Sequence, residues 1–375
     1  MPYLLLRGVY LGMKGEIIYT YFYDFTDRIN LTEIKNYLRG AQEFSFFEYG
    51  KAVPEGLNPF ELPILLNSGK KEVKFDSLSL SVNVQCVIYS VGAMAIRVRA
   101  PIEDISQQLM DKITFDKRFE KRFKEIADEA KNRVEKSLSK YLMVKEKKIF
   151  EMYRQYFLEQ TPKDFFEKNK SWIAGVLLDE QNYRDLSEDY INNTLKRNVA
   201  YYKYDSFIID WDAMFVISSS NYENEITVSD TANIQLLEYR VYQDEIDRMI
   251  GSVNERFSRI QRSPWYILLT RRNMIRLSNN ISDFYAEYKD LIDDVNKIVM
   301  SFGEWYLARI YAALSDSFRL NDIEKRLQST FDMLVNIRSF IQDQVSEDSS
   351  SFLEWIVILL FIIEIIIIVL PLLKI

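Results

Sequence analysis

The chain has 375 residues, a net charge of −7, one cysteine and no histidine. The lack of histidine excludes Ser-His-Asp and Cys-His nucleophile activation, histidine general-base catalysis and most zinc sites. The acidic balance argues against a general nucleic-acid binder, and the lone Cys86 excludes an internal disulfide and fits a reducing compartment.

Any catalysis would therefore use carboxylates, lysines or tyrosines, with oxygen-ligated Mg²⁺ or Mn²⁺ as the remaining metal option. We predict that the protein is not an enzyme and that it has no cofactor.

Residues 1–112 are predicted to form an N-terminal α+β module. The segment GEIIYTYFYDF (15–25) is rich in aromatic and β-branched side chains and predicts a strand. Asn30 can cap a short helix after it, two strands lie on either side of Gly92, and Pro101 is expected to begin a helix.

Residues 113–170 are predicted to form a charged helical connector. Phe119, Phe123 and Ile126 recur at helical spacing, and basic residues gather within the same two turns. These basic residues are Lys117, Arg118, Lys121, Arg122 and Lys124. They could form an RNA- or lipid-facing surface, but the interleaved acidic side chains favour the solvated face of an amphipathic helix.

Residues 171–260 show a similar order and predict a second α+β module. WIAGVLLDE (172–180) resembles a strand, and two strand-like runs within 201–219 predict a hairpin. Ser229 or Asp230 is expected to cap the long helix that follows. The recurring order suggests two ferredoxin-like modules, each strand-helix-strand-strand-helix. Coincidence is the alternative, because no residues match between the halves.

Asp205, Asp210 and Asp212 are the candidate metal or catalytic residues. They lie along the predicted hairpin, where alternation about Trp211 could direct the last two carboxylates to one face, so that they hold a divalent ion. Aspartate at a tight turn more often bonds to the backbone, so the same residues also fit a structural role.

Residues 261–350 are predicted to form a long helical hairpin or coiled coil. Apolar side chains recur at alternating intervals of three and four residues, with a break near Ser315, and this spacing is typical of a coiled-coil seam. The predicted seam consists of Leu277, Ile281, Phe284, Leu291, Val295, Ile298, Leu320, Ile323, Leu327, Leu334, Ile337 and Ile341. The helices could pair within one chain or between chains, and a homo-oligomer is expected.

The segment 352–373 is predicted to form a transmembrane helix. From Trp355 onward it is almost unbroken hydrocarbon, and about 20 such residues span the ~30 Å core of a bilayer. Glu364 suggests a contact between anchors inside the bilayer, with a simply tolerated charge as the alternative, and Pro371 lies near the end of the span. A buried core helix or strand is the alternative. We expect a single-pass protein anchored in the lipid bilayer by its C-terminus, with its body facing the cytoplasm.

Three stretches resemble the Rmd/Sif-type family, which includes proteins required for meiotic nuclear division. They are DSFIIDWDAMFVI (205–217), ANIQLLEYRVYQDEID (232–247) and FLEWIVILLFIIEI (352–365), and the resemblance covers mainly 170–375. It implies a membrane-anchored, mostly helical C-terminal half, an α+β body and no established enzymatic activity. A mitochondrial member of that family is linked to organelle translation as an oligomeric tether, which favours a scaffold.

These observations predict an α+β protein that acts as a tail-anchored membrane scaffold or tether. It would self-associate and position a protein or ribonucleoprotein partner at the membrane, and nucleic acid by itself is not favoured as the partner. The alternative is a membrane-tethered, metal-dependent hydrolase or nuclease that uses the carboxylate cluster.

Overall fold

The computed structural model describes most of the chain. The described residues are 13–41, 45–46, 63–75, 78–139, 142, 149–159, 161–219, 221–262, 275–276, 278–290, 292–293 and 305–339. They belong to two compact units. The sheet unit comprises Met1–Val241 and Asp293–Ile323, and the helical unit comprises Tyr242–Ile292 and Glu324–Ile375.

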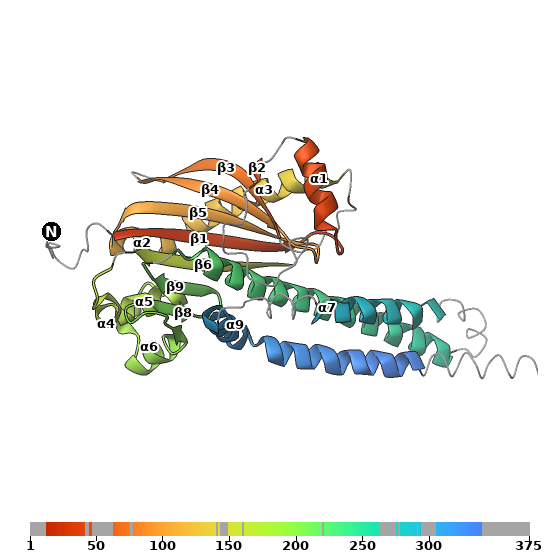
Figure 1. Ribbon diagram of the computed structural model, residues 1–375. Coiled ribbons are helices and arrows are strands. Elements are labelled where there is room, and N and C mark those ends of the chain that lie inside the picture. Colours follow the sequence, from red (N-terminus) through yellow and green to blue (C-terminus); the bar gives the residue numbers. More distant parts are fainter. Residues whose placement is uncertain are drawn as a thin grey trace, which may run out of the picture. The chain divides into compact units, whose positions relative to one another are not determined.

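A mixed sheet of nine described strands forms the centre of the sheet unit (Figure 1). The strands are β1 (Met13–Asp24), β2 (Ser45–Phe46), β3 (Ile64–Phe75), β4 (Leu78–Ile88), β5 (Ala93–Ile105), β6 (Phe150–Glu159), β7 (Asn198–Val199), β8 (Ser206–Ile209) and β9 (Ala213–Ile217). Their spatial order is β2-β3-β4-β5-β1-β6-β9-β8-β7, and only β6 and β9 pair in parallel. The predicted α+β class is confirmed.

The two halves of the chain contribute different strand pairings to this sheet. In the first half β1 pairs antiparallel with β5, whereas in the second half β6 pairs in parallel with β9. β1 and β6 are themselves antiparallel neighbours. The described strands therefore form one continuous sheet with two different arrangements, not two copies of a ferredoxin-like module.

Local signals near the N-terminus are partly confirmed. Asn30 caps α1 (Leu31–Ala41), because its side-chain oxygen accepts a hydrogen bond from Thr32 N at 3.0 Å. Gly92 lies in the β4–β5 turn with a φ of 89°, where a side chain would be strained. The helix predicted at Pro101 is wrong. β5 runs through this residue, past the end of its pairing with β4, and the following helix is capped by Ser106.

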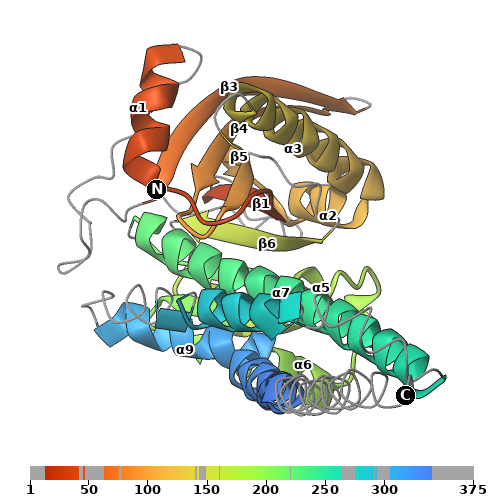
Figure 2. The ribbon, with the colours of Figure 1, turned by 90° about the vertical axis from the view of Figure 1, so that its right-hand side faces the viewer.

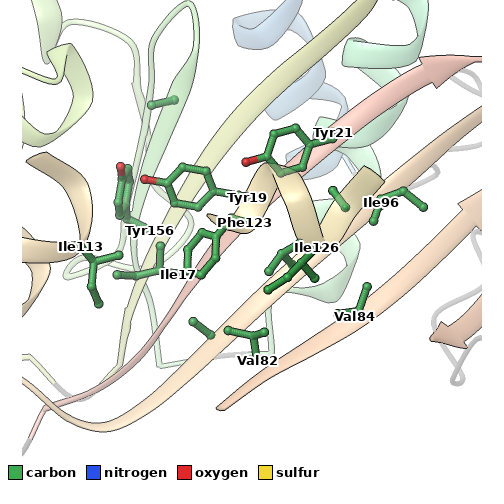
Figure 3. Packing of buried hydrophobic residues seen from close by; sticks show 14 of the residues in the cluster. Ile17, Tyr19, Tyr21, Val82, Val84, Ile96, Ile113, Phe123, Ile126 and Tyr156 are labelled. Atoms are coloured by element: carbon green, nitrogen blue, oxygen red, sulfur yellow. The ribbon is translucent and has the colours of Figure 1, made fainter. Parts of the chain in front are cut away.

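Helix α3 (Lys117–Leu138) covers one face of the sheet, preceded by α2 (Gln107–Phe115) (Figure 2). Phe119, Phe123 and Ile126 are buried, as their helical spacing predicts for one face of an amphipathic helix. The Phe123 ring meets the Tyr19 ring edge to face with 5.0 Å between centroids, in the core drawn in Figure 3. Within the segment 113–170, which is predicted to be a helical connector, α3 is therefore a packed layer of the sheet unit, and residues 150–159 form the strand β6.

Residues 172–178 of the predicted strand 172–180 instead form most of helix α5 (Lys170–Leu178). Every side chain from Trp172 to Leu177 is buried, so the apolar run has no solvent-facing gaps that would reveal its period. The helix ends at Asp179, whose φ of 54° is left-handed. The neighbouring elements are α4 (Phe165–Lys168), the 3₁₀ turn η1 (Tyr183–Asp185) and α6 (Glu188–Thr194). The predicted hairpin within 201–219 is confirmed as β8 and β9.

Helix α7 (Glu223–Arg262) begins before the predicted cap, and its first part crosses the other face of the sheet (Figure 2). Ser229 and Asp230 lie inside the helix and are fully buried. Asp230 pairs with Arg97 of β5, and Gln155 of β6 donates to Ser229 Oγ at 3.2 Å. Both residues therefore make buried contacts with the sheet and do not cap the start of the helix.

The helical unit has an aromatic centre. The Phe331 ring stacks on Tyr288 at 4.4 Å between centroids, and the Phe284 ring lies 5.5 Å from Phe331 and 5.2 Å from Tyr242. Phe284, Tyr288 and Phe331 are buried. Described helical segments of one chain therefore supply a core for this unit.

Seven of the predicted seam residues fall within the described part of the chain. Ile281, Phe284, Leu320, Leu327 and Leu334 are buried, and Ile323 and Ile337 are half-buried. Leu277, Leu291, Val295, Ile298 and Ile341 lie outside the described residues. The predicted break near Ser315 lies instead after α9 (Trp305–Phe318), at Arg319, whose φ is 56°. The expected homo-oligomer stays a prediction.

Among the helices that the structure describes, none is long and apolar enough to cross a bilayer. The long helices α3 and α7 carry charged side chains along their length. This finding corrects the predicted single-pass membrane protein and the localisation that depended on it. The anchor segment 352–373, with Trp355, Glu364 and Pro371, lies outside the described residues.

Candidate functional site

Four large aromatic side chains are exposed at the turn from β7 to β8 and at the start of α9. The exposed fractions are 60% for Tyr201, 59% for Tyr202, 48% for Tyr204 and 73% for Trp305. Helix α9 lies beside β8 (Figure 1). We call these four residues the aromatic surface. Isolated exposed apolar side chains are common, but several gathered in one place indicate a contact site.

Buried residues hold the aromatic surface in place. Asp205 Oδ2 accepts a hydrogen bond from Tyr202 N at 3.2 Å, and Asp205 N donates to the Tyr202 carbonyl at 3.1 Å, which closes the turn. The Tyr306 ring lies 5.0 Å from Tyr201 and 5.9 Å from Phe207 between centroids. Because Tyr306 and Phe207 are buried, the Tyr201 ring rests on the core of the sheet unit.

Three cations lie over the rings of this surface. Lys163 Nζ is 5.1 Å and Lys203 Nζ is 5.7 Å from the Tyr204 centroid. The Arg309 guanidinium carbon is 4.8 Å from the Trp305 centroid. Among the residues placed by the structure, these three cations form no ion pair with a carboxylate. The surface therefore presents positive charge in a chain whose net charge is −7.

Asp205, Asp210 and Asp212 have three different surroundings. Asp205 bonds to the turn, and Asp212 Oδ2 lies 2.6 Å from Arg154 Nη2. Asp210 is half-buried, and burial raises the pKa of its carboxyl. In the described stretches no three His, Cys, Asp or Glu side chains are grouped to hold a metal ion. The structural reading of Asp205 as a turn residue fits its hydrogen bonds.

Arg154 of β6 joins several elements through charge. Its side chain is buried, and its terminal nitrogens reach Asp212 at 2.6 Å and Asp179 at 3.3 Å. Asp179 ends α5 and also pairs with Lys117 at the start of α3. Since both terminal nitrogens already have carboxylate partners, the network links β6 to the surrounding loops and helices, and the guanidinium is not available for an anionic ligand.

The predicted basic surface of α3 is largely neutralised by ion pairs. Lys117 pairs with Glu120, Arg118 with Asp116, Arg122 with Glu125 and Lys124 with Asp128, while Lys121 is exposed. Exposed pairs of this kind contribute little to stability, but they cancel local charge. The arrangement fits the solvated helix face that the interleaved acidic residues favour.

A pocket of 630 Å³ lies between α2 and the segment around η1. Asp111 in its wall accepts a hydrogen bond from Trp172 Nε1 at 2.6 Å, and burial raises the pKa of the Asp111 carboxyl. Lys112 and Arg184 line the pocket together with Asp185, so both signs of charge surround it. Its size suits a small molecule, but its lining favours neither an anion nor a cation.

The aromatic surface could not be predicted from the sequence pattern. The available signal was the run Tyr-Tyr-Lys-Tyr at 201–204, which places three tyrosines around a lysine at the start of a predicted strand. Tyrosine is common in strands, so the run is read as part of a strand, and this interpretation does not indicate that its side chains are exposed. Trp305 is remote in sequence; α9 packs beside β7 and β8, and Tyr306, the residue after Trp305, contacts Tyr201.

Comparisons with known proteins relate the sheet unit to one family. The uncharacterized protein MJ0711 of Methanocaldococcus jannaschii is 26% identical over 225 residues, a match that covers 58% of this chain and 66% of that relative, slightly less than two thirds. No solved structure matches. These matches do not test the Rmd/Sif resemblance, which stays a prediction.

The family profile described as "Uncharacterized protein MJ0711, N-terminal domain" matches residues 14–223. This segment contains the strands from β1 to β9 and the tyrosines of the aromatic surface, whereas Trp305 lies beyond it. The match extends over more than half of the chain, which therefore belongs to the family of the MJ0711 N-terminal domain.

Proposed function

We propose that the protein is a non-enzymatic assembly platform that binds a macromolecular partner through the aromatic surface. The observation that carries this proposal is the exposure of Tyr201, Tyr202, Tyr204 and Trp305, with the Tyr201 ring packed on the buried Tyr306. Tyrosine, tryptophan and arginine are enriched at protein interfaces, and they supply most of the binding energy there. The surface combines these residue types in one place.

The size of the surface is consistent with an interface core. If each half-exposed ring buries about 100 Å² of apolar area on binding, four rings gain roughly 10 kcal/mol at ~25 cal/mol per Å². Association costs roughly 4–15 kcal/mol in lost freedom, so the rings alone give weak binding. Lys163, Lys203 and Arg309 would add electrostatic attraction for an acidic partner, which also increases the association rate.

Self-association belongs to this proposal as a second element. Its support is the coiled-coil spacing of the C-terminal helices. The described seam residues Ile281, Phe284, Leu327 and Leu334 are already buried within one chain. A second copy would therefore pack against a different face of these helices.

Tyrosine-selective labelling of the full chain tests the proposed function. In the purified protein, we expect Tyr201, Tyr202 and Tyr204 to react as readily as Tyr190, which is 53% exposed on α6. In cells of the native host, the partner should protect the first three, while Tyr190 should react as before. Equal labelling of all four tyrosines in cells would contradict the proposal.

A further inference from the structure

Building on the proposed function, we infer that the partner of the aromatic surface is a single-stranded nucleic acid. Such a polymer offers planar bases with exposed faces and one phosphate charge per nucleotide. The surface offers rings for the bases and cations for the phosphates, and the run Tyr201-Tyr202-Lys203-Tyr204 places a lysine between tyrosines.

The rings are arranged so that bases can reach them. Tyr201 and Tyr202 meet edge to face, with 4.7 Å between centroids and 81° between planes. In an edge-to-face pair one ring keeps its faces free of its neighbour, and a base can stack there. Trp305 is the most exposed of the large apolar side chains that the structure describes, and Arg309 lies over its ring. Guanidinium groups also stack on bases.

The cations of this surface differ from those of α3. On α3, Lys117, Arg118 and Lys124 are paired with carboxylates. At the aromatic surface, Lys163 and Lys203 lie over a tyrosine ring and form no carboxylate pair with any residue the structure places. Their charge is therefore available to phosphate groups, although the chain as a whole is acidic.

Two other anionic partners fit the surface less well. A duplex hides the faces of its bases in the stack, so the exposed tyrosines would have only backbone to contact. An acidic peptide supplies charge, but its carboxylates leave the ring faces unused. The combination of exposed rings with cations that have no carboxylate partner in the described part of the chain favours a single strand. Three cations can contact only a few phosphates, so the salt dependence of binding should be modest, with a slope of roughly −0.7 for each phosphate neutralised.

Fluorescence anisotropy with the full chain and a labelled uridine dodecamer tests the inference. The variants are Tyr202→Ala and Lys203→Glu, and the matched control is Lys121→Glu on α3, which makes the same charge change at an exposed site. Thermal unfolding checks that each variant is folded. We expect Tyr202→Ala to weaken binding about tenfold, as for the loss of one stacked base. Lys203→Glu should weaken binding. It should also reduce the steepness of the plot of log binding constant against log salt concentration by about 0.7. Lys121→Glu should bind like the wild type.

No binding of the dodecamer, or equal weakening by Lys121→Glu and Lys203→Glu, would overturn the inference. Competition by a glutamate-rich peptide or a duplex as effective as competition by unlabelled single strand would overturn it too. Protection of Tyr201, Tyr202 and Tyr204 in cells, together with no dodecamer binding, would reject the nucleic acid and leave the proposed function intact. If the tyrosines are not protected in cells and the dodecamer does not bind, both the nucleic acid and the proposed function are rejected.

Discussion

Arg97 of β5 and Asp230 of α7 form an ion pair inside the sheet unit, with Nη2 2.7 Å and Nε 2.8 Å from Oδ2. Both side chains are almost completely buried, and the Tyr89 hydroxyl donates to the same carboxylate oxygen at 3.4 Å. Gln155 and Ser229 add a hydrogen bond beside the pair. These contacts fasten the first part of α7 to the sheet.

Removal of one partner of this ion pair should destabilise the protein strongly. Asp230→Ala leaves the Arg97 charge buried without its carboxylate, which typically costs ~3–5 kcal/mol. Replacing both residues, by Arg97→Met with Asp230→Leu, should cost clearly less, because no buried charge remains. Urea unfolding of the full chain, followed in the sheet unit, measures the loss of stability in the single and the double variant. A single substitution that costs less than about 1 kcal/mol would show that the pair does not hold α7.

Phe331 should be essential to the core of the helical unit. Phe331→Ala removes a buried ring that contacts Phe284 and Tyr288, and such truncations cost ~3–5 kcal/mol. Met333→Ala on the same helix is the matched control, because Met333 is exposed and its loss should change stability by at most about 0.5 kcal/mol. Hydrogen exchange of the helical unit compares the stability of the two variants. Equal effects would contradict the aromatic core.

The buried carboxyl of Asp111 predicts a pH dependence of stability. Burial raises its pKa above 3.8, against the hydrogen bond from Trp172 and the charge of Arg184. The folded state therefore binds this proton more tightly than the unfolded state. The resulting stability is present below pH 3.8 and is lost as pH rises through the raised pKa. Asp111→Asn should thus increase Tm at pH 7 and lose this advantage near pH 3. A Tm gain that is equal at both pH values would refute this assignment.

Addition of Mg²⁺ or Mn²⁺ should leave the melting temperature unchanged. Asp212 already pairs with Arg154, and Asp205 bonds to the backbone of its turn, so the carboxylates are not assembled for a metal. The same titration on Asp212→Asn is the control. A metal-dependent increase in Tm that Asp212→Asn abolishes would support the hydrolase alternative.

Elements with one buried face could be predicted from the sequence. Phe119, Phe123 and Ile126 mark one side of α3 against charged neighbours, so the period of the helix is visible. Helix α5 could not be identified this way, because Trp172 to Leu177 are buried on all sides and show no period.

Polar residues were predicted less well, because the same residue types serve different purposes. Aspartate is a common helix-capping residue, so the sequence predicts a cap at Asp230. Its actual partner is Arg97, 133 residues earlier in the chain. Asp205, Asp210 and Asp212 are close in sequence, yet each has a separate environment: Asp205 bonds within its own turn, Asp212 pairs with the distant Arg154, and Asp210 is half-buried. The aromatic surface likewise depends on the distant Trp305. Only tertiary structure brings such residues together.

Photo-crosslinking from the aromatic surface shows whether a single-stranded nucleic acid binds there. A benzophenone amino acid would replace Tyr202 in the full chain in its native host, with the same substitution at Tyr190 as a matched exposed control. We predict a discrete crosslinked species from position 202 that nuclease treatment shortens, and none from position 190. The absence of a crosslink at 202, or the same products from both positions, would contradict the account.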